Sequence, residues 1–87
     1  MNANAAQVKA ESFMQDATKA LNRFSIFSSG TKFEDAADAY EKAGNQYKIA
    51  KQWQEAGTAY SKCADMKVRY IMSNMYMYMI MMMNRLN

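Results

Sequence analysis

Histidine and proline are absent from this chain of 87 residues, which also has only three glycines and one cysteine. Without histidine, the side chain that most often serves as acid, base or metal ligand near neutral pH is missing. The lone Cys63 excludes an internal disulfide and a zinc site of clustered cysteines. No glycine-rich phosphate loop is present. These absences argue against an enzyme, a cofactor or a metal site, and the scarcity of helix breakers favours an all-α interaction module.

Charge and the N-terminal residues narrow the function further. The 11 lysines and arginines exceed the 8 acidic residues by three, and the acids are interleaved with the bases. This small surplus disfavours nucleic-acid binding, which usually requires a dense basic stripe. Residues 1–7 are polar and resemble no export signal. We therefore expect a cytoplasmic protein with a reduced thiol at Cys63.

The spacing of apolar residues predicts three helices, over about 5–23, 32–50 and 53–70, packed as an antiparallel right-handed stack. Thr31 is a plausible N-cap for the second helix, because Glu34 follows three residues later as in a capping box. No strand pattern competes before residue 70.

A shift of twenty residues places Phe33–Lys42 over Trp53–Lys62, with the alanine, tyrosine and lysine positions matching. A fixed period of this size is typical of helical solenoids, whose repeats contact mainly their neighbours. We therefore expect antiparallel hairpins of a tetratricopeptide-like solenoid and a piece of a longer protein. Aromatic residues at helical spacing are usually core, so the predicted core includes Phe13, Phe33, Tyr40, Tyr47, Trp53 and Tyr60.

The segment 24–31 is the turn-rich part of the chain, with three serines, a glycine and a threonine beside Phe24, Ile26 and Phe27. These apolar residues could enter a bilayer, since each buried aromatic contributes about 1.5–3 kcal/mol. They could equally close the first helix onto the second. The residues alone leave both interpretations open.

Residues 43–60 carry a family resemblance. They contain Ala-Gly-Asn at 43–45, Tyr-Lys-Ile-Ala-Lys-Gln-Trp at 47–53 and Ala-Gly-Thr-Ala-Tyr at 56–60. Together with the aromatic loop, this stretch resembles the N-terminal helices of soluble NSF attachment proteins, the SNAP family. The Lys-x-Ala-Lys-x-Trp run is specific, because generic tetratricopeptide repeats carry these residue types at other spacings. The resemblance covers about residues 5–68.

The resemblance implies an adaptor of vesicle fusion that performs no chemistry. Such an adaptor binds bundles of syntaxin-type SNARE proteins and recruits the NSF ATPase, which disassembles them during intracellular transport such as ER–Golgi traffic. It lies peripherally on the cytosolic face of membranes. Because SNAPs are several-fold longer, we expect this chain not to stimulate disassembly alone. The alternative is a generic tetratricopeptide-like scaffold that binds a peptide.

The resemblance also implies roles for individual residues. It assigns membrane contact to Phe24, Ile26 and Phe27, of which Phe27 is the safer choice because Phe24 falls on the inner helical stripe. Basic side chains could contact anionic lipid or the acidic SNARE surface, although a solvated outer face explains them equally. These side chains are Lys19, Arg23 and Lys32 beside the loop, and Lys48 and Lys51 farther along.

The match fades near Val68, so we divide the chain into repeats over 1–70 and a low-complexity tail over 71–87. The tail is rich in methionine and tyrosine, which suggests translation of an intron or a shifted frame. Its uninterrupted apolar run, 75–83, is shorter than the roughly twenty residues that span a bilayer. An interfacial helix would lack a charged face. The simplest expectation is an extension of the third helix with an adhesive methionine surface.

Overall fold

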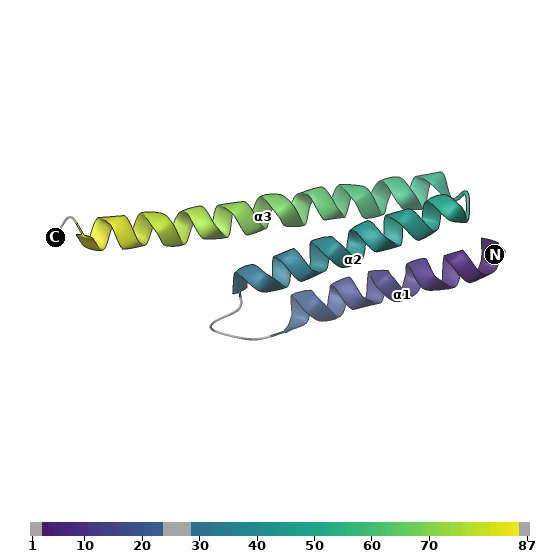
Figure 1. Ribbon diagram of the computed structural model, residues 1–87, viewed down its shortest axis with the longest axis horizontal. Helices are drawn as coiled ribbons and strands as arrows, with labels where there is room; N and C mark the ends of the chain where they lie inside the picture. Colours follow the sequence, from purple (N-terminus) through teal and green to yellow (C-terminus); the bar gives the residue numbers. More distant parts are fainter. Residues whose placement is uncertain (1–2, 24–28, 86–87) are drawn as a thin grey trace.

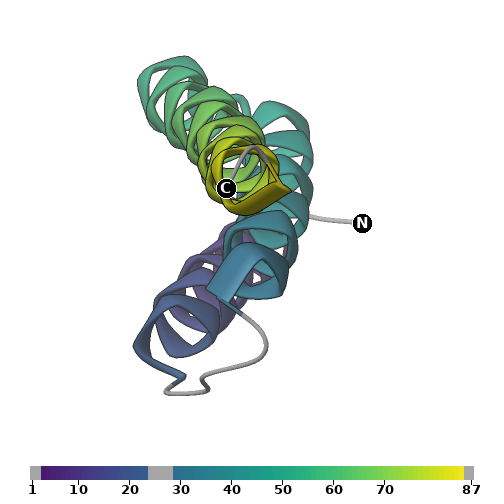
Figure 2. The ribbon, with the colours of Figure 1, turned by 90° about the vertical axis from the view of Figure 1, so that its left-hand side faces the viewer.

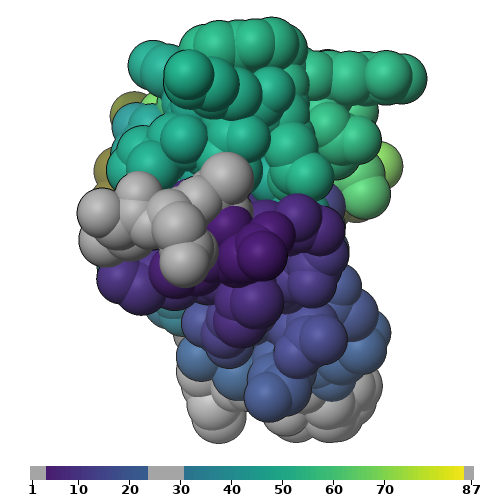
Figure 3. All heavy atoms as spheres, turned by 90° about the vertical axis from the view of Figure 1, so that its right-hand side faces the viewer, coloured from purple at the N-terminus to yellow at the C-terminus, as the bar shows by residue number. Residues whose placement is uncertain are grey.

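The computed structural model describes residues 3–23 and 29–85, and it consists of three helices. They are α1 (Ala3–Asn22), α2 (Ser29–Ile49) and α3 (Trp53–Arg85). The helices run antiparallel in one curved row with α2 in the middle (Figures 1 and 2). The view from the end at which α1 begins shows α1 on one side and the start of α3 on the other (Figure 3). The all-α prediction is confirmed, and no strand occurs in the described ranges.

One helix end differs from the predicted one, and another agrees with the expectation for the tail. Helix α2 begins at Ser29 rather than near residue 32, so Thr31 lies inside its first turn and the predicted N-cap is wrong. Serine, glycine and threonine are tolerated there because the first N–H groups of a helix need no partner within it. Helix α3 continues to Arg85, as the extension expected of the tail, and projects past the beginning of α2 (Figure 1).

The turn between α2 and α3 is closed by backbone hydrogen bonds. The N–H of Gln52 donates to the carbonyl of Tyr47, and the N–H of Lys51 donates to the carbonyl of Lys48, both at 2.9 Å. This pair of bonds is the Schellman motif of helix C-termini. It requires a left-handed residue, and Lys51 has that conformation with φ 60°. The short turn fixes the antiparallel direction of α3.

Alanine dominates the core. Two clusters lie between the helices, one joining Ala17 to α2 and to Cys63 and Met66, the other joining Ala10 to α2 and α3. Of the aromatic residues predicted to be core, Tyr40 and Tyr47 are buried, whereas Phe13, Phe33 and Tyr60 are half-buried at the edges. Small side chains let the helices approach closely. The fully buried alanines are Ala6, Ala10, Ala17, Ala36, Ala43 and Ala59.

Gly44 marks a close contact between α2 and α3. A Cβ atom there would lie 2.6–2.8 Å from three ring carbons of Tyr60, so the tyrosine ring rests directly on the α2 backbone. The Tyr60 hydroxyl donates a hydrogen bond of 2.6 Å to Oδ1 of Asn45. Ring position and hydroxyl bond together set how α3 is placed along α2.

Trp53 is exposed, so its prediction as a core residue is wrong. Its exposed fraction is 64%, and Gly57, Ala64 and Lys67 on the same helix are also exposed. The middle helix α2 has neighbours on two sides, and its apolar pattern serves both. Helix α3 repeats that pattern, but in the described residues it packs mainly against α2, through Ala56, Ala59, Cys63 and Met66.

Gly44 and Gly57 provide a matched test of this packing. In Gly57→Ala, the new methyl group meets nothing within 4 Å, so the better helix propensity should stabilise the protein by about 0.5–1 kcal/mol. In Gly44→Ala, overpacking against Tyr60 should cost about 1–3 kcal/mol and outweigh the same gain. Urea unfolding followed by circular dichroism measures both. Equal stabilisation by the two changes would contradict the close contact.

Candidate functional site

The end of the stack where α1 finishes and α2 begins holds the basic residues predicted to flank the membrane loop. Arg23 forms an ion pair with Asp35 of α2, and both side chains are about half exposed. The Lys32 Nζ lies 5.4 Å from the centroid of the Phe33 ring. Lys19 is exposed in the last turn of α1. The structure therefore brings these three cations to one end, with Arg23 also joining the two helices. Phe24, Ile26 and Phe27 lie outside the described residues.

Lysines lie over the rings at the edges of the core. Lys42 of α2 has its Nζ 6.0 Å from the ring centroid of Phe13 in α1. Twenty residues later, Lys62 of α3 lies 5.8 Å from the ring of Tyr40 in α2. These distances suit cation–π attraction, which contributes about 0.5–1 kcal/mol at exposed sites. Lysines twenty positions apart therefore each contact a ring of the preceding helix, although the two rings, half-buried Phe13 and buried Tyr40, are not themselves twenty positions apart.

The hairpin between α2 and α3 presents two of the lysines predicted to face an acidic partner. Lys48 and Lys51 are both exposed, and the Lys48 Nζ lies 5.9 Å from the ring of Tyr60. Lys51 adopts the left-handed conformation that normally favours glycine. This conformation costs a non-glycine residue about 1–2 kcal/mol. Glycine would therefore suit this position of the turn better than lysine does.

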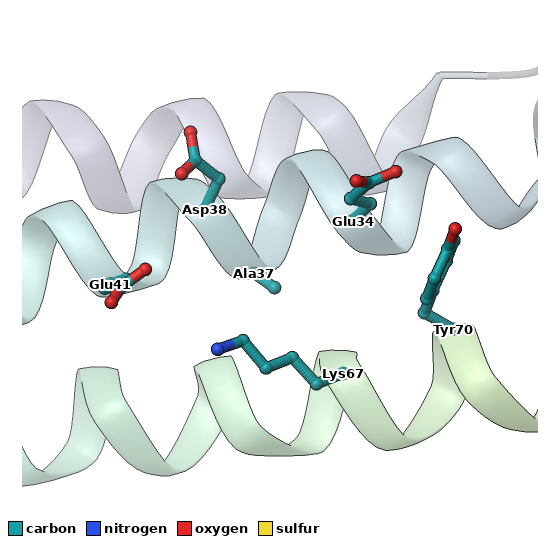
Figure 4. A pocket seen from close by; sticks show the side chains of 6 residues that line it. All are labelled: Glu34, Ala37, Asp38, Glu41, Lys67 and Tyr70. Atoms are coloured by element: carbon teal, nitrogen blue, oxygen red, sulfur yellow. The ribbon is translucent and has the colours of Figure 1, made fainter.

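A shallow groove of about 170 Å³ between α2 and α3 was not predicted from the sequence. Glu34, Asp38 and Glu41 line it from α2, and Lys67 extends between the helices beneath Ala37 (Figure 4). The signal was present in the i, i+4, i+7 spacing of the three acids. The groove is acidic, so the chain offers a basic hairpin end and an acidic α2 edge. No group of three or more histidine, cysteine or acidic residues among the described positions could hold a metal ion.

Two titratable groups lie in the core. Burial raises the pKa of the Cys63 thiol; nearby Lys67 lowers it, whereas Glu41 and Asp38 raise it further. Burial also raises the pKa of Tyr47, and Glu11 and Glu55 act in the same direction. Both groups are therefore held in their neutral forms, which agrees with the expectation of an inert cysteine.

These raised pKa values predict a loss of stability in alkali. Because the folded state favours the protonated forms, their contribution is complete below the ordinary thiol pKa of 9.0 and is lost as the pH rises through the folded values. The melting temperature should therefore be level near neutrality and fall above pH 9. In Cys63→Ala the fall should begin later, near the ordinary tyrosine pKa of 10.0. An unchanged pH profile in that variant would contradict a role for the thiol.

No described helix is both long enough and apolar enough to cross a membrane.

Comparison with known proteins agrees with this helical architecture. The family model for soluble NSF attachment protein, SNAP, matches residues 8–77. The chain is 44% identical over 54 residues to an alpha-soluble NSF attachment protein of Vitis vinifera, covering 62% of this chain and 18% of that protein. It is 32% identical over 62 residues to a probable vesicular-fusion protein sec17 homolog of Schizosaccharomyces pombe, covering 68% and 22%.

The human alpha-soluble NSF attachment protein is 34% identical over 44 residues, which cover 51% of this chain and 15% of the human protein. The chain thus spans less than a quarter of each of these three relatives. No solved structure matches it.

Proposed function

The chain belongs to the soluble NSF attachment protein family, and from this membership we propose that it is the N-terminal part of a SNARE-binding adaptor in vesicle fusion. The family match over residues 8–77 carries the proposal. The packing supports it, because Gly44, Asn45 and Tyr60, which belong to the motif behind the resemblance, form the contact between α2 and α3. These three residues of the motif therefore determine how α3 packs against α2.

The proposed adaptor supplies shape and charge rather than chemistry. Its partner would be an assembled bundle of syntaxin-type SNARE proteins, and the NSF ATPase would be recruited by parts of the protein that correspond to the unmatched length of the relatives. The 87-residue chain alone should therefore bind the bundle without accelerating its disassembly. A pull-down on assembled bundles and a disassembly assay with NSF test the two halves of this statement.

Lys48 and Lys51 are the residues proposed to contact an acidic partner. They project from the hairpin end, away from the acidic groove at Glu34 and Asp38. The conformational cost at Lys51 supports the proposal, because strained residues concentrate at functional positions. Replacement of Lys51 by glycine would relieve that strain and also remove the charge. The substitution should therefore raise stability while it weakens binding.

We expect Lys51→Gly to stabilise the chain by about 1 kcal/mol, since glycine adopts positive φ without steric cost. The same change should weaken binding to the SNARE bundle, with a larger effect at low salt, because an exposed charge is screened by ions. Thermal melts and a salt-dependent pull-down measure the two effects. Lys9→Gln, which removes an exposed charge from α1, is the control. Undiminished binding by Lys51→Gly would remove this lysine from the proposed surface.

The membrane contact is proposed for the loop residues Phe24, Ile26 and Phe27, helped by Lys19, Arg23 and Lys32. In support, the described cations Lys19, Arg23 and Lys32 gather at the end of the stack that this loop joins. Arg23 is already paired with Asp35, so apolar contact should provide most of the affinity. Peripheral attachment to the cytosolic face of membranes would follow.

Replacing both Ile26 and Phe27 with serine should weaken liposome binding by about a hundredfold or more, if each loses about 1.5–3 kcal/mol of apolar burial. The melting temperature should change little, and the effect should persist at high salt. The matched control replaces Val8 and Ile49, which are 64% and 51% exposed at the opposite end of the stack, with serine. A lower melting temperature with intact liposome flotation would show that the loop residues pack inside the protein.

A further inference from the structure

A continuous apolar stripe runs along α3 on a different face from the one that contacts α2. With Tyr60 counted, its members follow one another at intervals of three or four positions, apart from one adjacent pair, Ile71 and Met72, and this spacing keeps them on one side of the helix. The large members are between 50% and 64% exposed. We call this surface the outer α3 stripe; it consists of Trp53, Gly57, Ala64, Val68, Ile71, Met72, Met75, Met79 and Met82.

The internal repeat shows what this face is shaped to receive. On α2, Gly44 lies beneath the Tyr60 ring of α3, and Ala37 lines the groove beside Lys67 of α3. Twenty positions later, the corresponding residues on α3 are Ala64 and Gly57. Both are exposed, and a Cβ on Gly57 would meet nothing within 4 Å. The outer α3 stripe therefore repeats a helix-binding face, with no helix against it in the described chain.

We propose that the outer α3 stripe binds the same stripe of a second copy of this chain, with the two α3 helices antiparallel about a two-fold axis at Val68. In this register, five members of the stripe face one another across the axis, and the others face residues beside the stripe. Gly57 and Met79 both lie eleven positions from Val68, and Ala64 and Met72 both lie four positions from it. Each small residue thus faces a methionine, whose flexible side chain adapts to the available space. A two-fold contact of this kind is closed, as in most dimers.

The length of α3 also favours this arrangement. Its 33 residues extend over roughly 50 Å at 1.5 Å per residue. In an antiparallel pair, the projecting methionine half of each helix lies along the Trp53 half of the other. The two halves of the outer α3 stripe, against which no other described helix packs, are covered together. An isologous pair also continues the antiparallel packing that α1, α2 and α3 already show (Figure 1).

Other occupants fit the structure less well. Head-to-tail stacking would place the stripe against α1, but Val8 is the only large hydrophobic residue of α1 that is exposed among the described positions. A lipid surface would also cover Met77 and Met81, which lie on another side of the extension and remain exposed in the proposed pair. The experiment must therefore separate a second copy from a bilayer.

Analytical ultracentrifugation of the 87-residue chain should show a monomer–dimer equilibrium. Val68 is 52% exposed, so a charge there should leave the monomer folded, as circular dichroism can verify. Val68→Glu and Val68→Lys should each raise the dissociation constant at least tenfold, because each brings like charges together at the axis. An equimolar mixture of the two should recover the dimer. Val8→Glu on α1 is the matched control and should dimerise like the parent chain.

The direction of the helices is tested by cross-linking in a Cys63→Ala background. A mixture of Gly57→Cys and Met79→Cys chains should form a disulfide-linked heterodimer, whereas a parallel pair would hold these positions far apart. A monomer up to the solubility limit, a dimer indifferent to Val68→Glu, or a mixture of the charged variants that stays monomeric overturns the proposal. So does a monomeric parent chain that binds phosphatidylcholine vesicles and loses that binding in Val68→Glu, because lipid would then occupy the stripe.

Discussion

The absence of a side chain at Gly44 allows the Tyr60 ring to lie on the α2 backbone, and much of the remaining structure depends on this contact. With the ring in place, its hydroxyl reaches Asn45 and fixes α3 along α2. The close approach of the helices favours small side chains, and the described residues with no exposed surface are alanines, beside the larger buried Tyr40, Tyr47, Cys63 and Met66. Phe13 and Phe33 are half-buried at the edges, where lysine side chains lie over them.

An alanine core has an energetic consequence. Each buried methyl contributes only about 0.8 kcal/mol, so many close contacts are needed to offset the entropy of ordering the chain. A chain of this length also buries a limited fraction of its surface. Stability in such a stack comes from neighbouring helices covering one another. The central α2, covered on two sides, is the best supported helix, whereas α3 keeps one apolar face uncovered along its length.

The helices and their order could be predicted because periodicity and breakers are local features of the sequence. The exposure of Trp53 could not, because the repeat copies the apolar pattern of the middle helix onto a helix with one main neighbour. The groove lined by Glu34, Asp38 and Glu41 depends on how α3 is rotated against α2, which periodicity alone does not specify. The beginning of α2 was missed because serine and threonine suit both a cap and a first turn.

The residues that carry the family resemblance divide by physical role. Gly44, Asn45 and Tyr60 make the contact that builds the hairpin, so any protein with this hairpin geometry has a structural reason to contain them. Lys48 and Lys51 are exposed, and Lys51 occupies a left-handed position at a conformational cost that glycine would avoid. The fold therefore accounts for the small and aromatic residues of the motif but gives no reason for the lysine. Since the lysine lowers stability relative to glycine where it stands, its strained conformation favours a role in what the hairpin end contacts over a role in folding.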